Sequence, residues 1–213
     1  MATFANAQQV YDTIGLFLDQ GLTALKDKLG PINWQFPPHR KFTREYFDTF
    51  LSLLPKEKDK VRLRHALEVR ASGFDAPEFF DLLTKYGATV VWADDDTFPK
   101  LRHEGADFAV TRMMRTQSGE ETGYPGGDIA KFAKMYKDWS AKQDVFAFFI
   151  SGAKERNPAA AMSLQDKLGI TPATAKEADA MAAGKAAPKT TVAAKAAPKK
   201  TAPKKPTTSK KKK

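Results

Sequence analysis

The sequence predicts an α/β protein with a parallel sheet, and two observations predict it. Five short apolar runs each end in a polar or charged residue, and helix-like segments separate most of them. This alternation is typical of a parallel β/α array, which keeps its binding and catalytic groups at the carboxyl ends of its strands. The five runs are Pro31–Phe36, His65–Arg70, Ala88–Asp94, Phe108–Met114 and Val145–Ser151.

Two helices are expected to flank the first of these strands. Apolar residues over Ala7–Leu29 fall close to one helical face, and a Gly-Pro pair ends that segment. A second helix is expected to begin near Thr43, a suitable N-cap, and to end at Pro55. The charged residues Lys56–Arg64 then predict a loop that leads into the second strand.

A third helix is expected between the second and third strands. Asp75–Glu78 resembles a capping box with proline in the first turn, and Gly87 is a suitable residue to end the helix in the left-handed conformation. The residues that follow the third strand, Asp94–Asp107, predict a loop with little helix.

Two more helices are expected around the last strand. A polar, glycine-rich loop, Thr116–Gly127, precedes a helix that Asp128 is expected to cap. After the last strand, Pro158–Leu168 predicts the final helix, with Asn157 as its cap.

The net charge of the chain is concentrated at one end. The chain has 213 residues and a formal charge of +10, and residues 171–213 hold 12 Lys against two acidic residues, so this segment carries the whole imbalance. Its Ala, Pro, Lys and Thr composition gives it little apolar surface to bury, which predicts disorder. We therefore divide the chain into a folded domain, 1–170, and a disordered Lys/Ala/Pro-rich tail, 171–213.

Lysines on a flexible scaffold neutralise phosphates without reading bases, so the tail favours nonspecific attraction of DNA or RNA. The alternative interpretation is a solubilising tail with no partner. The candidate nucleic-acid-binding residues are Lys199, Lys200, Lys204, Lys205, Lys210, Lys211, Lys212 and Lys213.

Several classes of site find no support in the sequence. The chain has no Cys, which excludes disulfides, thiolate zinc sites and Cys nucleophiles. Its three His are scattered, and Asp94–Asp96 favours a solvated loop over a cation site, so we expect neither a metal nor a cofactor. No signal-peptide pattern and no apolar run near the roughly 18 residues of a membrane span occur, so we expect a soluble, cytoplasmic protein with no membrane partner.

Alternation along the strands predicts which side chains share a face. Glu68 and Arg70 fall on the polar face of the second run, opposite Leu67 and Val69, and helices should cover the apolar face. A buried carboxylate or guanidinium needs a partner, and Asp94 and Arg112 at other strand ends are the obvious candidates.

Two interpretations of these residues stay open. The functional one is a polar pocket for an anionic or polyhydroxy ligand, and the structural one is a layer of satisfied salt bridges that fills the interior. The residues concerned are Gln35, Glu68, Arg70, Asp94 and Arg112.

The order of four segments is similar to that of a known family. The segments are Leu29–Pro38 (Leu-Gly-Pro-Ile-Asn-Trp-Gln-Phe-Pro-Pro), Ala66–Arg70 (Ala-Leu-Glu-Val-Arg), Val90–Asp94 (Val-Val-Trp-Ala-Asp) and Asp107–Arg112 (Asp-Phe-Ala-Val-Thr-Arg). Over roughly residues 10–168 they resemble the YecE-like family, domain of unknown function 72. The resemblance implies a TIM-type β/α barrel with a site at the carboxyl ends of the strands, and no established reaction.

The resemblance also implies ligand-binding positions. Gln35, Arg70 and Arg112 match polar positions of the family pattern, as do the candidate catalytic carboxylates Glu68 and Asp94. Tyr124 falls in a loop where the family usually has a Tyr, and Asn157 falls near its late Asn-Ala step. These three strand positions and two loop positions make up the expected ligand-binding set.

The sequence departs from the family pattern at three places. Arg112-Met-Met-Arg115 stands where the family tends to have Arg-x-His-Gly, and Ile150-Ser-Gly152 stands where it tends to have Asn-Asn-Asp. The family also has about three further strands before the segment that begins this chain, so we expect a partial barrel of about five strands that is truncated at its N-terminus. Two exposed sheet edges would follow, and they would favour self-association.

Three functional hypotheses are therefore carried forward. The first is a YecE-like barrel protein of unestablished activity with a strand-end pocket for an anionic small molecule and a basic tail that attracts nucleic acid. The second is a hydrolase or isomerase that acts on a phosphorylated or sugar-like substrate with Glu68 as acid/base. The third is a non-enzymatic module that associates with nucleic acid.

Overall fold

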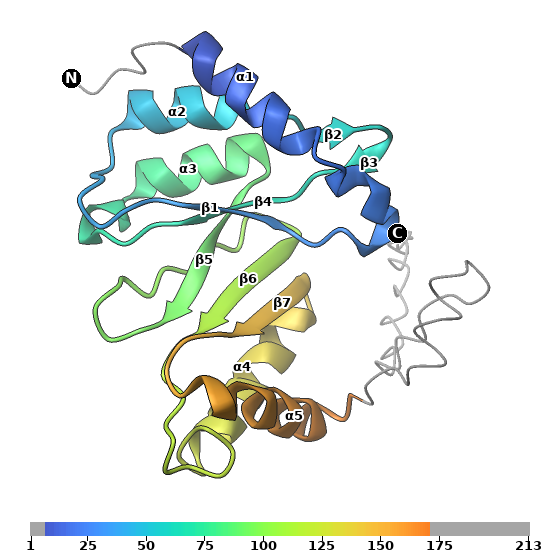
Figure 1. The fold of residues 1–213 in the computed structure, drawn as a ribbon. Coiled ribbons are helices and arrows are strands. Elements are labelled where there is room, and N and C mark those ends of the chain that lie inside the picture. The colour runs from blue at the N-terminus through green and yellow to red at the C-terminus, as the bar shows by residue number, and fades with distance from the viewer. Residues whose placement is uncertain (1–6, 171–213) are drawn as a thin grey trace, which may run out of the picture. The chain divides into compact units, whose positions relative to one another are not determined.

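A five-stranded parallel sheet forms the centre of the computed structural model, which describes residues 7–170 (Figure 1). The strand order is β1-β4-β5-β6-β7, and every neighbouring pair is parallel. Successive strands of the sheet thus lie side by side in chain order, as short β/α crossovers dictate. The strands are β1 (Ile32–Gln35), β4 (His65–Glu68), β5 (Thr89–Asp94), β6 (Phe108–Met113) and β7 (Asp144–Phe149).

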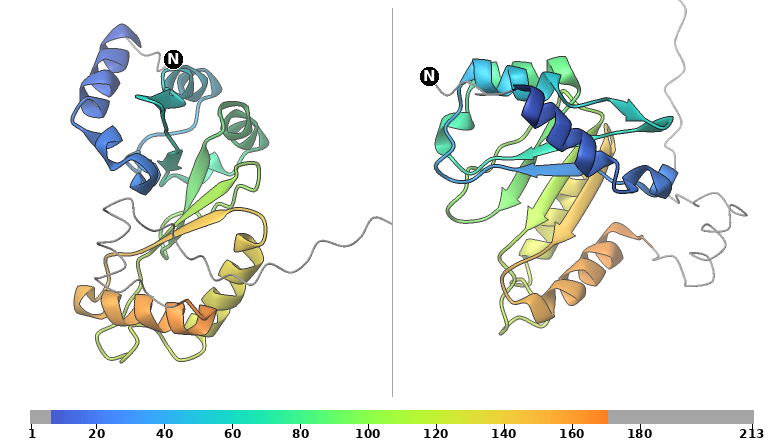
Figure 2. Two further views of the ribbon diagram at one scale, coloured as in Figure 1. Left: turned by 90° about the vertical axis from the view of Figure 1, so that its right-hand side faces the viewer. Right: turned by 45° about the horizontal axis from the view of Figure 1, so that its top comes forward.

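Helices flank this sheet in two groups (Figure 2). The first group packs over β1, β4 and β5, and the second packs over β6 and β7. The α-helices are α1 (Ala7–Leu18), α2 (Arg44–Ser52), α3 (Pro77–Tyr86), α4 (Asp128–Ser140) and α5 (Asn157–Leu168), and three short 3-10 helices are η1 (Leu22–Lys28), η2 (Ser72–Phe74) and η3 (Lys154–Arg156). None of the helices within residues 7–170 is long and apolar enough to cross a membrane.

The two faces of the sheet have different surroundings. On the helix-covered side, which we call the outer face, Leu67, Val90 and Met113 join two clusters with residues of the helices. On the other side, the inner face, Val91 and Val110 are buried in a cluster to which no described helix contributes. The curl of the sheet buries these inner residues against one another, and the apolar positions alternate with the outer ones as the strand period requires.

The sheet does not close on itself within residues 7–170. β1 pairs only with β4, and β7 pairs only with β6, so each has one edge without a partner strand. The predicted α/β class, the five parallel strands and the covering helices are confirmed. The barrel-like arrangement is present as an open sheet rather than a closed cylinder.

Two predictions of secondary-structure type are wrong. The segment expected as one helix, Ala7–Leu29, is α1 followed by η1, because Gly21 takes a left-handed conformation with φ of 90° between them. The charged loop expected at 56–64 contains a hairpin of β2 (Glu57–Lys58) and β3 (Val61–Arg62). In both cases a tight turn interrupts a segment whose apolar or charged pattern gave no boundary.

The sequence predicted the carboxyl end of α3 correctly, but it predicted the amino-terminal caps of the helices less well. Gly87 ends α3 with φ of 69°, as predicted. None of the three expected caps, Asp75, Asp128 and Asn157, holds the N-cap position. The N-cap is Ala76 in α3, Gly127 in α4 and Arg156 in α5. Thr43 does occupy the N-cap of α2, but its side chain makes no capping hydrogen bond.

Candidate functional site

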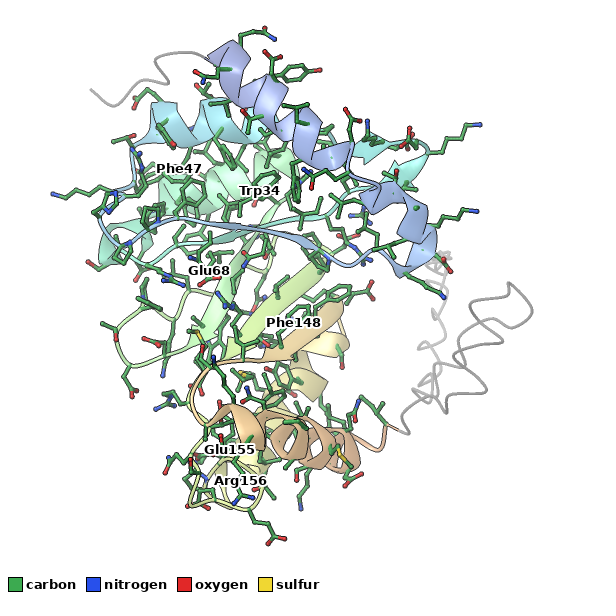
Figure 3. The ribbon with its side chains drawn as sticks, viewed as in Figure 1. Trp34, Phe47, Glu68, Phe148, Glu155 and Arg156 are labelled. Carbon is green, nitrogen blue, oxygen red and sulfur yellow. The ribbon has the colours of Figure 1, made fainter. Side chains whose placement is uncertain are left out.

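Glu68 is the centre of a polar cluster on the inner face at the carboxyl end of β4 (Figure 3). Its side chain is 1% exposed, and it accepts hydrogen bonds from three donors. Asn33 Nδ2 donates to Oε2 at 2.9 Å, and Arg70 Nη2 donates to Oε1 at 2.9 Å. Arg112 Nη1 also donates to Oε2. A buried carboxylate in this structure is therefore fully satisfied by partners from three strands or strand ends.

Strand register brings these partners together. Gln35 of β1 is aligned with Glu68 of β4, so the two side chains share the inner face. Arg112 of β6 is aligned with Ala93 of β5, and its long side chain reaches across that alanine to Glu68. Its Nη1 also contacts Gln35 Oε1 at 3.3 Å. The small side chain at position 93 thus leaves room for a contact between strands that are not neighbours.

The cluster carries a surplus of positive charge. Arg70 and Arg112 both pair with the single carboxylate of Glu68, which leaves one net positive charge among these paired groups, and Asp95 attracts Arg70 electrostatically without pairing with it. The arginine side chains are 20% and 21% exposed, and in the described part of the chain Arg112 Nη2 and Arg70 Nη1 have no hydrogen-bond partner. The Arg70 guanidinium makes a cation–π contact with Phe98, whose ring centroid lies 4.6 Å from the guanidinium carbon. The arrangement can donate further hydrogen bonds to an anion.

The pKa of Glu68 is lowered from its ordinary value. Burial alone would raise this pKa, but the hydrogen bonds from Arg112, Asn33 and Arg70 outweigh burial. Glu68 is therefore a permanent anion near neutral pH, and its charge fixes the two arginines.

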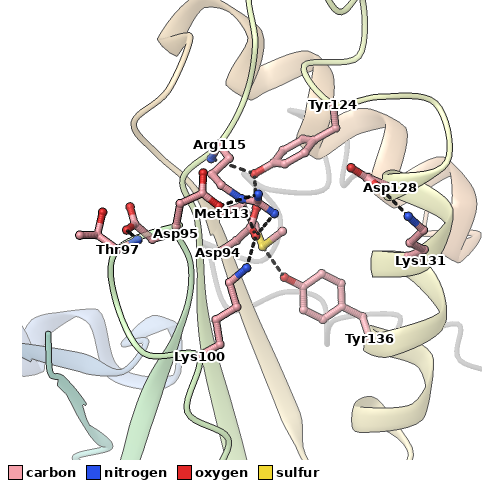
Figure 4. A network of polar contacts seen from close by, with 11 residues as sticks. Asp94, Asp95, Thr97, Lys100, Met113, Arg115, Tyr124, Asp128, Lys131 and Tyr136 are labelled. Carbon is pink, nitrogen blue, oxygen red and sulfur yellow. Dashed lines mark hydrogen bonds and ion pairs between the residues drawn. The ribbon is translucent and has the colours of Figure 1, made fainter. Parts of the chain in front are cut away.

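Asp94 does not lie in this cluster, contrary to the expectation from its place at a strand end. It aligns with Met113 and shares the outer face with Trp92, so the sheet separates it from Glu68. Figure 4 shows its own network, in which Arg115 Nη2 donates to Oδ1 at 2.7 Å and the Tyr124 hydroxyl donates to Oδ2 at 3.0 Å. Arg70, for which Asp94 was a candidate partner, pairs with Glu68 instead.

The Asp94 network connects the loop after β5 with the loop after β6. Arg115 also contacts Asp96 at 2.9 Å, and Lys100 lies 3.7 Å from Asp94. The Tyr124 hydroxyl accepts a bond from the backbone N–H of Arg115 at 3.2 Å, and burial raises its pKa, so it stays protonated. Positive and negative charges are balanced in this group.

The three consecutive aspartates diverge instead of converging. Asp94 and Asp96 take different nitrogens of Arg115, while Asp95 accepts the backbone N–H groups of Thr97 and Phe98 at 2.7 and 3.1 Å. Within residues 7–170 no three His, Cys, Asp or Glu are grouped so that they could hold a metal ion.

The remaining predicted residues lie elsewhere. Asn157 sits at the start of α5, where its Oδ1 accepts the Thr116 hydroxyl at 2.8 Å. That hydroxyl also contacts the carbonyl of Ser151 at 3.1 Å, so Asn157 joins the loop after β6 to α5. The eight tail lysines lie outside the described residues.

Sequence reasoning omitted two residues that the structure makes important. Asn33 contacts Glu68 directly, and its position two residues before Gln35 was a usable signal because both lie on one strand face. Arg115 is the main partner of Asp94, and nothing in the local pattern indicates this pairing, which depends on the loop after β6 folding back over the end of β5.

Comparison with known proteins agrees with this fold. A DUF72 family protein of Enterococcus faecalis V583 has a solved structure with a TM-score of 0.60 and 18% identity, over 74% of this chain and 68% of that one. A DUF72 family protein of Thermotoga maritima MSB8 gives 0.57 and 20%, over 74% of this chain and 64% of that one. None of the curated proteins matches the chain.

The family model described as protein of unknown function DUF72 matches residues 2–185. That match takes in both polar clusters and every described strand. The chain belongs to the DUF72 family, whose biochemical activity is not established.

Proposed function

We propose that the chain binds an anionic small molecule on the inner face of its sheet, at the carboxyl ends of β4 and β6. The observation that carries this proposal is the surplus guanidinium: Arg70 and Arg112 share one buried carboxylate. A phosphate or carboxylate group would supply the second anion, and it would replace water at the outward-facing N–H groups.

The neighbouring amides suit the rest of such a ligand. Gln35 and Asn33 of β1 are solvent-exposed, and they lie on the same face of the sheet as Glu68 of β4. Amide groups both donate and accept hydrogen bonds, so they can bind hydroxyls beside the anionic group. A phosphorylated or sugar-like compound therefore fits the donor set better than a purely apolar anion.

A hydrolase or isomerase reaction with Glu68 as acid/base is the second proposal. The lowered pKa of Glu68 favours the ionised form, which suits a base better than an acid. Asp94 would not assist it, because it lies on the outer face. Turnover of a sugar phosphate that Glu68→Gln abolishes would support this role, and unchanged turnover in that variant would remove it.

Binding can be measured by titration calorimetry of the full chain with glucose 6-phosphate. Arg112→Gln should abolish the signal from the inner-face site, because it removes the surplus charge while Glu68 keeps Arg70 and Asn33. Arg115→Gln is the matched control, since it removes an arginine from the outer-face network. Equal loss of binding in both variants, or no loss in either, would contradict the proposal.

The tail is proposed to attract DNA or RNA without sequence preference. Its 12 Lys in 171–213 support this, because phosphate neutralisation releases counterions. Deletion of 171–213 should remove salt-sensitive retention on DNA. A truncated chain with the same salt dependence would contradict the proposal.

Two further expectations from the sequence stay proposals. The unpaired edges of β1 and β7 favour self-association, which sedimentation at several concentrations would detect as a rising mass.

A cytoplasmic location would be tested by fractionating cells that produce the protein.

A further inference from the structure

A groove of about 590 Å³ lies at the opposite end of the strands from Glu68. One wall is η1, and the other is the β2–β3 hairpin, which stand side by side near the start of β1 (Figure 1). Arg64, which directly precedes β4, also lines it. The groove therefore belongs to the amino-terminal ends of the strands and is distinct from the inner-face site. Its volume is in the range of sites for small ligands.

Four basic residues line the groove, and the side chains of two of them have no ion-pair partner in residues 7–170. Arg62 forms a two-pronged pair with Asp107 at 2.7 and 2.8 Å, and Arg64 pairs with Asp144 at 3.2 Å. The side chains of Lys26 and Lys60 form no ion pair or hydrogen bond with any residue in 7–170. Each wall of the groove therefore contributes one lysine whose ammonium donors are available for a ligand.

Strained backbone is concentrated at the same place. Within residues 7–170, the non-glycine residues with left-handed φ are Lys26, Asp59, Lys60 and Ser151, and the first three line the groove. The hairpin turn explains the φ of 52° and 63° at Asp59 and Lys60. It does not explain Lys26, whose φ of 51° and ψ of −123° belong to a region that side-chain-bearing residues avoid. Such strain is typical of positions where a side chain is held for a ligand.

Carboxylates in the lining restrict the kind of anion. Asp27 and Asp59 also line the groove, and Asp59 accepts the Thr23 hydroxyl at 2.7 Å. These carboxylates would repel a long polyanion but can accept hydrogen bonds from ligand hydroxyls. We propose that this groove is a second binding site, in which Lys26 and Lys60 hold the phosphate of a small phosphorylated polyol while the aspartates accept its hydroxyls.

The site can be isolated in the Arg112→Gln background, which removes the inner-face contribution. Ribose 5-phosphate is the probe, titrated by calorimetry at low and high salt. Lys26→Gly with Lys60→Gly should weaken binding at least about tenfold, as loss of two charge-assisted contacts implies. Lys28→Ala is the matched control: it removes one lysine from the same short helix without touching the groove lining, and it should change affinity less than about twofold.

Glycine was chosen because it separates charge from strain. Both positions have positive φ, so glycine should leave the melting temperature unchanged or raise it. Weaker binding in a variant that is at least as stable supports the proposal. Unchanged affinity in the double variant overturns it, and so does a result in which a single-stranded oligonucleotide binds through the two lysines while ribose 5-phosphate does not.

Discussion

Glu68 and Asp94 are buried carboxylates at the ends of neighbouring strands, yet their surroundings differ. Each side chain is 1% exposed and pairs with arginine. Glu68 lies on the inner face between two guanidiniums, which leaves a surplus positive charge. Asp94 lies on the outer face, where Asp94 and Asp96 balance Arg115 and Lys100.

The difference shows that a buried acid at a strand end does not by itself mark a site. Around Asp94, the Arg115 guanidinium and the Tyr124 hydroxyl donate to the carboxylate, and Asp96 and Lys100 complete a group in which the charges are balanced. Around Glu68, donors outnumber acceptors and point towards a face that no described helix covers. Surplus charge, rather than burial, separates the proposed binding site from the Asp94 network.

The largest stability effect is expected from Asp94→Ala. This change leaves the Arg115 guanidinium without its main partner and frees the Tyr124 hydroxyl. Loss of one partner of a buried pair predicts a decrease of about 3 kcal/mol in the free energy of unfolding. Urea denaturation measures it, and glucose 6-phosphate affinity should stay unchanged after correction for folded fraction.

If Asp94→Ala abolishes ligand binding while the protein is still fully folded, the claim that only the Glu68 cluster binds the ligand is wrong. Arg115→Gln provides the comparison, because it breaks the same pair by removing the arginine, which is 38% exposed, and leaves the buried Asp94 carboxylate with the Tyr124 hydroxyl and Lys100. Its cost should be comparable to that of Asp94→Ala, since the charge left behind is the buried one.

Glu68→Gln should cost about 2 kcal/mol of stability near pH 7, because two guanidiniums lose their anion but keep access to water. The pKa of Glu68 is lowered from 4.5 by its donors, so the unfolded chain takes up the proton first as pH falls. The stabilisation is thus complete above about pH 5 and is lost as pH falls through the folded pKa.

The pH dependence gives the measurement. The stability difference between the parent chain and Glu68→Gln should narrow as urea denaturation is repeated from neutral to acidic pH. A difference that stays constant across that range would show that Glu68 is not held as an anion. Glu68→Gln also removes a negative charge that would repel an anionic ligand. Stronger glucose 6-phosphate binding in this variant would show that the loss of repulsion matters more than the role of Glu68 in positioning the two arginines.

Within each strand, the sequence predicted side-chain directions correctly. Trp92 and Asp94 share a face, as period-two alternation requires, and so do Glu68 and Ala66. The error lay in grouping Asp94 with Glu68 because both end strands. Which strand ends approach one another depends on register and sheet curl, and these arise from contacts between distant segments.

Turns limited the rest of the prediction. The break at Gly21 lies inside a segment whose apolar period continues through Leu22, so periodicity alone gave no boundary. The β2–β3 hairpin turns at Asp59 and Lys60, which lack the glycine that usually marks such turns. Pairing of Arg115 with Asp94 was equally hidden, because it needs the loop after β6 to be in place.

Tyr124→Phe tests whether the Asp94 network is structural in detail. The change removes a donor to Asp94 Oδ2 and an acceptor for the Arg115 N–H but keeps the ring packed against Phe132, at a centroid distance of 5.2 Å. Loss of one buried hydrogen-bonding group predicts about 1 kcal/mol of destabilisation in urea. A larger loss of ligand affinity than of stability would place Tyr124 in the binding site and erase the contrast.

Asn33→Ala should have the smallest effect and sharpens the comparison furthest. Asn33 is exposed, so water can replace the one hydrogen bond that its amide donates to the Glu68 anion, and its loss predicts about 0.5 kcal/mol of destabilisation. Both arginines keep their carboxylate, so the surplus charge persists, and glucose 6-phosphate affinity should fall less than about threefold. Arg112→Gln removes the surplus itself and should abolish binding at the inner-face site. If Asn33→Ala weakened binding as strongly as Arg112→Gln, amide contacts rather than charge would define the inner-face site, and the charge difference between the two clusters would no longer explain which one binds.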